Sequence, residues 1–292
     1  MDKAVRHAVR RAFEQAAAGY EQSAFLQKEI GKRLDEHLDG MKLAPQRILD
    51  AGSGTGLALP LLRARYPGAE IVVLDLAHGM LKQALRLGDE KGWRRWFTRL
   101  TPPASRLTAV CADIERLPLA PASVDLVWSN LALQWVDIDA AFREVQRVLR
   151  PGGLFLFATF GPDTLRELRE ASADLDGHAH VNRFIDMHDI GDALLHAGLA
   201  DPVMEMERLT LTYDRLEDLL RDLRGIGAHT VLENGRRGLM GKTAWRRLKD
   251  NYERCRRDGS LPATYEVIYG HAWGAERKQL DDGRQIIRWK PA

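Results

Sequence analysis

Glycine at every second position is the feature of this sequence best suited to binding a small molecule. Gly52, Gly54 and Gly56 follow an apolar run and precede a helical pattern at Leu57–Arg65, an order that predicts a strand, a tight turn and a helix N-terminus. Glycines permit positive φ and close approach of a ligand, and the helix N-terminus would offer free N–H groups to an anionic group. A dinucleotide fingerprint would instead need a glycine at position 57. An ordinary strand-to-helix turn has the same pattern, so other residues must support a binding site.

Three further polar residues follow the next predicted strands. Asp75 closes the second strand, Asp113 the third, and Asn130 follows the fourth. The crevice outside the carboxyl ends of parallel strands is where ligands bind in such sheets. The Asp75 carboxylate can accept hydrogen bonds from both hydroxyls of a ribose, and Asp113 would lie at an adenine edge. Each residue alone also suits a helix cap or a turn, but their order and spacing together predict a nucleoside-type site.

Composition and charge limit the classes of protein to which this chain can belong. The 292 residues are 45% hydrophobic and 29% charged, with a formal net charge of +2, as in globular proteins. No apolar run approaches the ~20 residues that span a bilayer, and the first residues lack an apolar secretory segment. Cys111 and Cys255 form no Cys-x-x-Cys pair, and His178 and His180 have no further ligands nearby. We therefore expect a cytoplasmic protein without a metal, a membrane contact or a nucleic-acid partner.

Strand and helix patterns alternate through the middle of the chain. Five apolar strands are predicted, at residues 48–50, 71–75, 107–113, 124–129 and 154–160. The last of these is entered through a turn at Arg150–Gly153. Such strands, separated by helices, indicate a parallel sheet covered on both faces. Val203–Tyr213 and Tyr265–Trp273 predict a late antiparallel pair.

The same patterns predict one domain over residues 1–292. Its core sheet would occupy about 45–213 and 262–292, with N-terminal lid helices at 1–40 and an inserted helical cap at about 214–261. The cap region is basic: from Arg236 to Arg257 there are nine basic and two acidic residues, a local net charge of +7. That charge suits either a solvated helix face or a docking surface for an acidic partner.

Several segments resemble a known family. ILDAGSGTG, CADIERLPL, VDLVWSNLALQWV and LRPGGLFLFATF, with Asp75, together resemble class I S-adenosylmethionine-dependent methyltransferases over roughly residues 45–160. The flanking AFEQAAAGYEQSAFLQKEI, FGPDTLRELREA, HVNRFIDMHDIGDALLHAGL and LPATYEVIYGHAWG are similar to the BioC family, the malonyl-acyl-carrier-protein O-methyltransferases of biotin synthesis. The resemblance implies a Rossmann-like α/β fold with a doubly wound, mostly parallel seven-stranded sheet whose last strand is antiparallel.

The resemblance also implies the cofactor S-adenosyl-L-methionine and the residues that hold it. These are Tyr20, Asp50, Gly52, Ser53, Gly54, Gly56, Asp75, Leu76, Met80, Asp113, Ile114 and Asn130. Tyr20 would act as a lid residue at the methionine end of the cofactor. Its alternative role is a core tyrosine between packed helices.

The implied reaction is methylation of the free carboxylate of malonyl-acyl-carrier protein, which gives the methyl ester that primes pimeloyl synthesis for biotin. A malonyl carboxylate is ionised at neutral pH, so no general base is needed. It still needs a cation to offset its desolvation, and Arg183 is the candidate. Tyr20, Gln134 and Trp135 complete the expected catalytic set, although Arg183 also suits a surface loop and Trp135 a core position.

Acyl carrier protein is the implied partner, and its acidity would match the basic cap. The expected docking residues are Arg236, Arg237, Lys242, Arg246 and Arg247. Two other functions stay open. One is the modification of an arginine on a partner protein, as in complex I assembly factors with similar flanks. The other is a non-catalytic, cofactor-binding assembly module.

Overall fold

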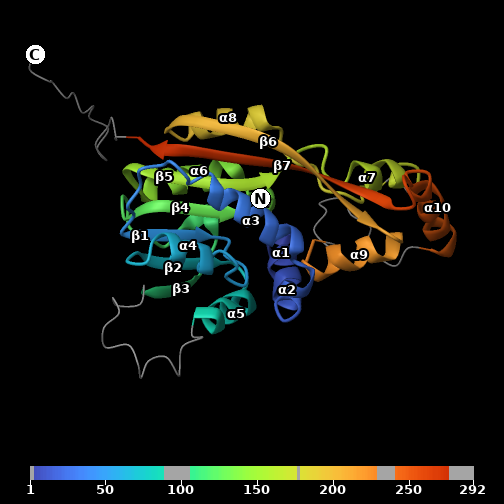
Figure 1. Cartoon of the computed structure of the whole chain (residues 1–292), viewed down its shortest axis with the longest axis horizontal. Coiled ribbons are helices and arrows are strands. Elements are labelled where there is room, and N and C mark those ends of the chain that lie inside the picture. Colours follow the sequence, from blue (N-terminus) through green and yellow to red (C-terminus); the bar gives the residue numbers. More distant parts are fainter. Residues whose placement is uncertain (1–2, 89–105, 176–177, 229–240, 276–292) are drawn as a thin grey trace, which may run out of the picture.

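The computed structural model describes residues 3–88, 106–175, 178–228 and 241–275, which contain one seven-stranded sheet. The strands lie in the order β3-β2-β1-β4-β5-β7-β6 (Figure 1). Strands β1 to β5 are parallel, and β7 is antiparallel to both β5 and β6. The strand bounds are β1 Arg47–Ala51, β2 Glu70–Asp75, β3 Leu107–Cys111, β4 Val124–Asn130, β5 Leu149–Phe160, β6 Leu199–Tyr213 and β7 Leu261–Gly274. The expected fold, a doubly wound and mostly parallel sheet, is confirmed.

Both faces of the sheet are covered because successive residues of its central strands point to opposite sides. Ile48 and Trp128 join a buried cluster with helices α3 (Phe25–Glu36) and α4 (Leu59–Arg65), whereas Leu49 joins a second cluster on the other face. The second cluster includes residues of α6 and α8, which have the bounds Ile138–Val148 and Met187–His196. Helix α5 (His78–Gly88) contacts β2 and β3. Burial on both faces explains why these strands are apolar without alternation.

Helix α6 shows how the local sequence sets an element. Its N-cap residue Asp137 accepts a hydrogen bond from the Ala140 amide at 3.0 Å, which satisfies one of the unpaired N–H groups of the first turn. Phe142, Val145 and Val148 are buried on one side of the helix. This spacing of apolar residues places α6 against the sheet.

The ribbon of β6 and β7 extends past the carboxyl end of β5. The last β5–β7 pair is Phe160 with Val267, whereas β6 and β7 remain paired to Tyr213 and Leu261. Figure 1 shows that helices α9 and α10 are carried at this far end of the ribbon. Their bounds are Leu216–Gly225 and Lys242–Glu253, and they contact α2 (Tyr20–Ser23) and α7 (Arg166–Ser172), respectively. The division of the chain into a core sheet and an inserted cap at about 214–261 stays a prediction.

The structure differs from the sequence predictions at several element boundaries. Helix α4 begins at Leu59 rather than Leu57. Residues 150–153 belong to β5, where the pairing shifts between Val124 and Leu126 of β4 and Gly152 has a φ of +75°. The predicted turn at this place is therefore an irregularity within a strand. Both late strands begin four residues earlier than predicted, since backbone pairing continues beyond the alternating apolar pattern.

None of the helices in the described part of the chain is long and apolar enough to cross a membrane.

Candidate active site

Positive φ at three alternate glycines shapes the loop after β1. The φ angles are +77° at Gly52, +55° at Gly54 and +85° at Gly56, as the sequence predicts. A Cβ atom on Gly52 would lie 2.3 Å from the Cβ atom of Ala132, and one on Gly56 would lie 2.9 Å from that of Ala84. A Cβ atom on Gly54 would meet nothing within 4 Å. The outer glycines are therefore needed for packing, whereas the middle one faces open space.

The N–H groups of this loop donate within the protein. The amides of Gly52 and Ser53 donate to the Leu74 carbonyl oxygen at 2.8 and 2.9 Å. The Gly54 amide donates to Oδ2 of Asp75 at 2.9 Å. These three loop amides are therefore paired with the end of β2. The prediction that free N–H groups at the N-terminus of the following helix bind an anion concerns other amides and stays a prediction. The loop presents side chains and an open surface to a ligand.

Two carboxylates lie beside the loop, Asp50 buried and Asp75 half-buried. Asp50 is 2% exposed, and burial together with the nearby Asp75 carboxylate raises its pKa to about 8. Burial also raises the pKa of Asp75 to about 6, although hydrogen bonds from the amides of Ala77 and Gly54 oppose the rise. A cationic ligand placed between these groups would favour their ionised forms.

Unpartnered polar atoms gather at the same end of the sheet. In the described part of the chain, the following buried oxygen atoms have no hydrogen-bond partner: Oδ2 of Asp50, Oγ of Ser53, Oγ1 of Thr55 and Oδ1 of Asn130. Buried polar groups normally find partners. S-adenosylmethionine would supply an ammonium, two ribose hydroxyls and a sulfonium charge to these acceptors. The residues therefore fit the cofactor that the sequence predicts, and Thr55 is an addition to the predicted set.

Tyr20 lies on the Asp75 side of the site. It packs with Ala77 and Met80, both of which are fully buried. Burial and the Asp75 charge raise the pKa of its phenol above the ordinary value, so the hydroxyl is protonated at neutral pH. Leu76 is half-buried beside this group, between Asp75 and Ala77. The predicted contact of Tyr20 with the methionine end of the cofactor stays a prediction.

Helix α1 (Lys3–Ala16) is fastened over the site by polar contacts at both of its ends. Arg6 forms an ion pair with Asp113 at 2.9 Å and a second with Glu115, beside the buried Ile114. Oε2 of Glu14 accepts a hydrogen bond from the Gly79 amide at 3.0 Å. Helical patterning does not reveal the roles of Arg6 and Glu14, because their partners are 65 or more residues away in the chain.

A cavity of about 380 Å³, here the Arg183 cavity, lies beside the ends of β4 and β5. Its lining includes Arg183, Gln134 and Trp135, three of the four predicted catalytic residues, together with Thr159 and Phe160. Tyr20 is not among the lining residues. The structure therefore separates the predicted catalytic set into a cavity group and a residue beside the cofactor site.

Hydrogen bonds fix the cavity wall at the end of β4. Nε2 of Gln134 donates to the Leu131 carbonyl oxygen at 2.8 Å, and Oγ1 of Thr159 donates to Oε1 of Gln134 at 3.3 Å. Nδ2 of Asn130 donates to the Gln27 carbonyl oxygen at 2.9 Å. Hydrogen bonds thus connect Asn130 to α3 and Leu131 to Gln134 in the cavity wall.

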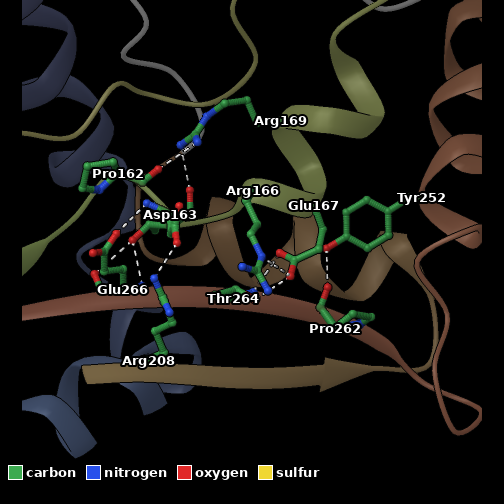
Figure 2. Close-up of polar contacts among 11 residues, drawn as sticks. Pro162, Asp163, Arg166, Glu167, Arg169, Arg208, Tyr252, Pro262, Thr264 and Glu266 are labelled. Atoms are coloured by element: carbon green, nitrogen blue, oxygen red, sulfur yellow. Dashed lines mark hydrogen bonds and ion pairs between the residues drawn. The ribbon is translucent and has the colours of Figure 1, made fainter. Parts of the chain in front are cut away.

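Two hydrogen bonds and one ion pair hold the loop after Phe160 (Figure 2). The Asp163 amide donates to Oε2 of Glu266 at 2.6 Å, and Arg208 pairs with the Asp163 carboxylate at 3.0 Å. Arg169 of α7 donates to the Pro162 carbonyl oxygen at 2.8 Å. These contacts fix the loop on β7 and β6, and Phe160 keeps its place in the cavity wall.

Three of the five predicted docking residues lie in the described part of the chain. Lys242, Arg246 and Arg247 are exposed on α10, whose opposite side buries Leu248 and Tyr252. The predicted docking residues Arg236 and Arg237 lie outside the described residues.

Comparison with known proteins places this site in a family. Residues 49–157 match a family described as a methyltransferase domain. The malonyl-[acyl-carrier protein] O-methyltransferase of Laribacter hongkongensis is 54% identical, with 97% of this chain and 95% of the relative aligned. The relative of the same name from Gallionella capsiferriformans is 51% identical over 97% of this chain and 96% of its own. The chain belongs to the malonyl-acyl-carrier-protein O-methyltransferase family.

Solved structures that resemble this family member share its fold. The YcgJ protein from Bacillus subtilis has a TM-score of 0.58 at 17% identity, over 84% of this chain and 99% of its own. Phosphoethanolamine N-methyltransferase 2 from Haemonchus contortus, solved with S-adenosylhomocysteine, has a TM-score of 0.51 at 18% identity, over 90% of this chain and 58% of its own.

Substitution of Gly54 by valine tests the open face of the glycine loop. Because a side chain at this position would enter the space above the loop at a positive φ, Gly54→Val should abolish S-adenosylmethionine binding measured by calorimetry. Gly54→Ala should weaken binding less, since it lacks the β-branch. Circular dichroism serves as the folding control, and a folded valine variant with wild-type affinity would contradict the site.

The raised pKa of Asp50 predicts a pH dependence of cofactor binding. A cationic cofactor favours ionised Asp50, whose pKa is raised to about 8 in its absence. Binding at pH 7 should therefore release a proton, and affinity should rise from pH 6 to about 8. Calorimetry in two buffers of different ionisation enthalpy measures the released proton.

Asp50→Asn is the matched variant for this measurement, because it keeps the shape of the side chain but cannot titrate. It should lose most of the proton release and the upper part of the pH dependence. S-adenosylhomocysteine, which lacks the sulfonium charge, should show a smaller rise in affinity. Equal proton release by wild type and Asp50→Asn would exclude Asp50 as the titrating group.

Proposed function

We propose that this chain transfers a methyl group from S-adenosylmethionine to the free carboxylate of malonyl-acyl-carrier protein. The product is the methyl ester that primes pimeloyl synthesis for biotin. Full-length similarity to relatives of this name supports the substrate. The structural observation that carries the proposal is that Arg183, an exposed residue, lines the cavity at the end of β4.

Arg183 is suited to bind a substrate carboxylate. Among the described residues, no carboxylate forms an ion pair with it, and the other charged residue that lines the cavity is Asp137. Asp137 is already used as the N-cap of α6. Most of the remaining lining is apolar, including Val5, Val9 and Phe142. A guanidinium in such surroundings pairs with a carboxylate in a bidentate manner and offsets its desolvation.

Positioning explains the reaction without a proton-transfer residue. When bound, S-adenosylmethionine supplies a methyl group that leaves a sulfonium, and an ionised malonyl carboxylate can accept it directly. Arg183 would hold the carboxylate, and Gln134, fixed by Leu131 and Thr159, would form the rigid wall beside it. Trp135, in edge contact with Phe13 of α1 at 5.6 Å between ring centroids, would exclude water. Orientation of this kind removes much of the barrier of a bimolecular step.

The cavity distinguishes this function from the modification of a partner arginine. An arginine substrate would bring a second guanidinium toward Arg183, and like charges at close range repel. A malonyl carboxylate has the complementary charge. The direct test is incubation with labelled S-adenosylmethionine and malonyl-acyl-carrier protein, which should give an alkali-labile methyl ester on the carrier thioester.

The carrier protein is proposed to dock on the exposed basic side of α10. Lys242, Arg246 and Arg247 lie there on a helix that packs on α7. Acyl carrier proteins are acidic, and complementary charge raises the rate of encounter. Lys249, on the same helix, already pairs with Glu217 at 3.0 Å and so belongs to the cap itself.

Removal of the Arg183 guanidinium should harm use of the malonyl substrate and spare cofactor binding. Arg183→Ala loses charge-assisted hydrogen bonds worth about 1.5–3 kcal/mol each, so kcat/KM for malonyl-acyl-carrier protein should fall about 10- to 100-fold. Arg183→Lys should recover little of this loss, because an ammonium cannot pair in a bidentate manner.

Steady-state kinetics at saturating cofactor measure the effect of both Arg183 variants. Arg86→Ala, which removes an exposed arginine from α5, is the control and should match the wild type. Near-normal rates in both Arg183 variants would remove this residue from the substrate site.

Reversal of charge on α10 should weaken docking of the carrier. Arg246→Glu combined with Arg247→Glu should raise KM for malonyl-acyl-carrier protein at low salt and reduce the salt dependence of kcat/KM. Cofactor affinity should stay unchanged. The control, Lys82→Glu with Arg86→Glu, makes the same change in net charge on exposed positions of α5. Equal effects of the two double variants would mean that only net charge matters.

A further inference from the structure

A second cavity, here the Tyr213 cavity, lies between the N-terminal helices and the cap. Its volume is about 370 Å³, within the range of small-molecule sites. It is bounded by α2 and α3 on one side and by β6 and α9 on the other. The lining residues are Ser23, Phe25, Leu26, Gln27, Thr210, Leu211, Thr212, Tyr213, Asp222, Leu223, Ile226 and Tyr265. None of them lines the Arg183 cavity or belongs to the predicted cofactor-binding set.

One row of aromatic rings connects the two cavities. The ring centroids of Phe184 and Phe160 are 5.8 Å apart, and those of Phe160 and Tyr265 are 5.7 Å apart. Phe184 and Phe160 line the Arg183 cavity, whereas Tyr265 lines the Tyr213 cavity. Phe160 therefore lies between the two cavities. The contacts of Asp163 with Glu266 and Arg208 hold the loop that follows it.

Both cavities also approach the carboxyl end of β4. Gln27 of the Tyr213 cavity accepts from Asn130 through its carbonyl oxygen, at 2.9 Å. Gln134 of the Arg183 cavity donates to the next residue, Leu131, at 2.8 Å. The end of β4 therefore lies between a cavity that contains Arg183 and a cavity that contains no cation among its lining residues.

The lining of the Tyr213 cavity suits a neutral chain that carries N–H donors. Its lining residues include a carboxylate, Asp222, but no lysine or arginine. Burial and the Asp222 charge raise the pKa of Tyr213 to about 12, so its phenol stays protonated. Oε1 of Gln27 is buried without a hydrogen-bond partner in the described part of the chain, on a residue that is 7% exposed. This surface would repel a carboxylate or a phosphate and would accept from amide groups.

We propose that the Tyr213 cavity binds the pantetheine-type chain that bears the malonyl thioester. This inference rests on the proposed function and adds the route of the substrate. The chain is linear and uncharged between its thioester and its phosphate, and its two amide N–H groups and one hydroxyl match Gln27, Asp222 and the phenols of Tyr213 and Tyr265. The carboxylate then reaches Arg183 on the other side of Phe160. The phosphate remains outside.

Two variants and three substrates test this assignment. Thr210→Trp places a large ring in the cavity at an exposed position of an edge strand that tolerates aromatic residues. Gln27→Met removes the unpartnered acceptor and keeps the length of the side chain. The substrates are malonyl-acyl-carrier protein, malonyl-coenzyme A and malonyl-N-acetylcysteamine, which lacks most of the chain. The long thioester that the wild type accepts shows whether the bound pantetheine chain comes from acyl carrier protein or from coenzyme A.

The expected result is a rise in KM of about five- to tenfold with the long thioesters in Gln27→Met and a larger rise in Thr210→Trp. Malonyl-N-acetylcysteamine should show wild-type kcat/KM with both variants, and cofactor affinity should not change. Val203→Trp, at an exposed position of β6 outside the cavity, and Gln22→Met, exposed on α2, are the matched controls. Thermal unfolding checks that each variant is folded.

Two results would overturn the assignment. One is an unchanged KM for the long thioesters in both variants, and the other is an equal loss with the short thioester. Both are distinct from failure of the proposed function, in which the wild type itself would form no methyl ester on any malonyl thioester.

Discussion

The Asp75 carboxylate joins the segments that make the cofactor site. One oxygen accepts from the Gly54 amide of the glycine loop and the other from the Ala77 amide at the start of α5, at 2.9 and 2.8 Å. Tyr20 lies close enough for the Asp75 charge to raise its pKa further. The half-buried carboxylate loses part of its hydration, and these N–H donors offset the cost of that desolvation. Loss of the carboxylate would therefore remove the hydrogen bonds that fix the glycine loop and the start of α5, and the charge that acts on Tyr20.

Asp50 adds a second buried carboxylate with a different role. It lacks the donors that stabilise Asp75, and one of its oxygens has no hydrogen-bond partner among the described residues. An acid kept near neutrality in this way is a site for a ligand that brings positive charge. Asp75 is thus bonded to the loop and to the residue before α5, whereas the predicted contact of Asp50 with the cofactor stays a prediction.

The substrate side of the site depends on the end of β4. Asn130 and Leu131 are bonded to Gln27 and Gln134, which belong to different cavities. Phe160 separates these cavities, and the Asp163 contacts with Glu266 and Arg208 hold the loop behind it. Under the two proposals, the carboxylate that reacts is held at Arg183, and the neutral chain that carries it lies in the Tyr213 cavity. Under our proposals, specificity would come from Arg183 in the lining of one cavity and from the absence of lysine and arginine in the lining of the other.

The sequence by itself determined the sheet, the glycine loop and the acids at its edge. Buried parallel strands are apolar, turns with positive φ require glycine, and both signals are local. Only the structure shows that the amides of Gly52, Ser53 and Gly54 are paired within the protein, because the end of β2 accepts hydrogen bonds from them. It also decided that Arg6 and Glu14 fasten α1 and that Gln27 and Tyr213 share a cavity. These contacts join residues far apart in the chain, and they arise from packing, which residue spacing does not encode.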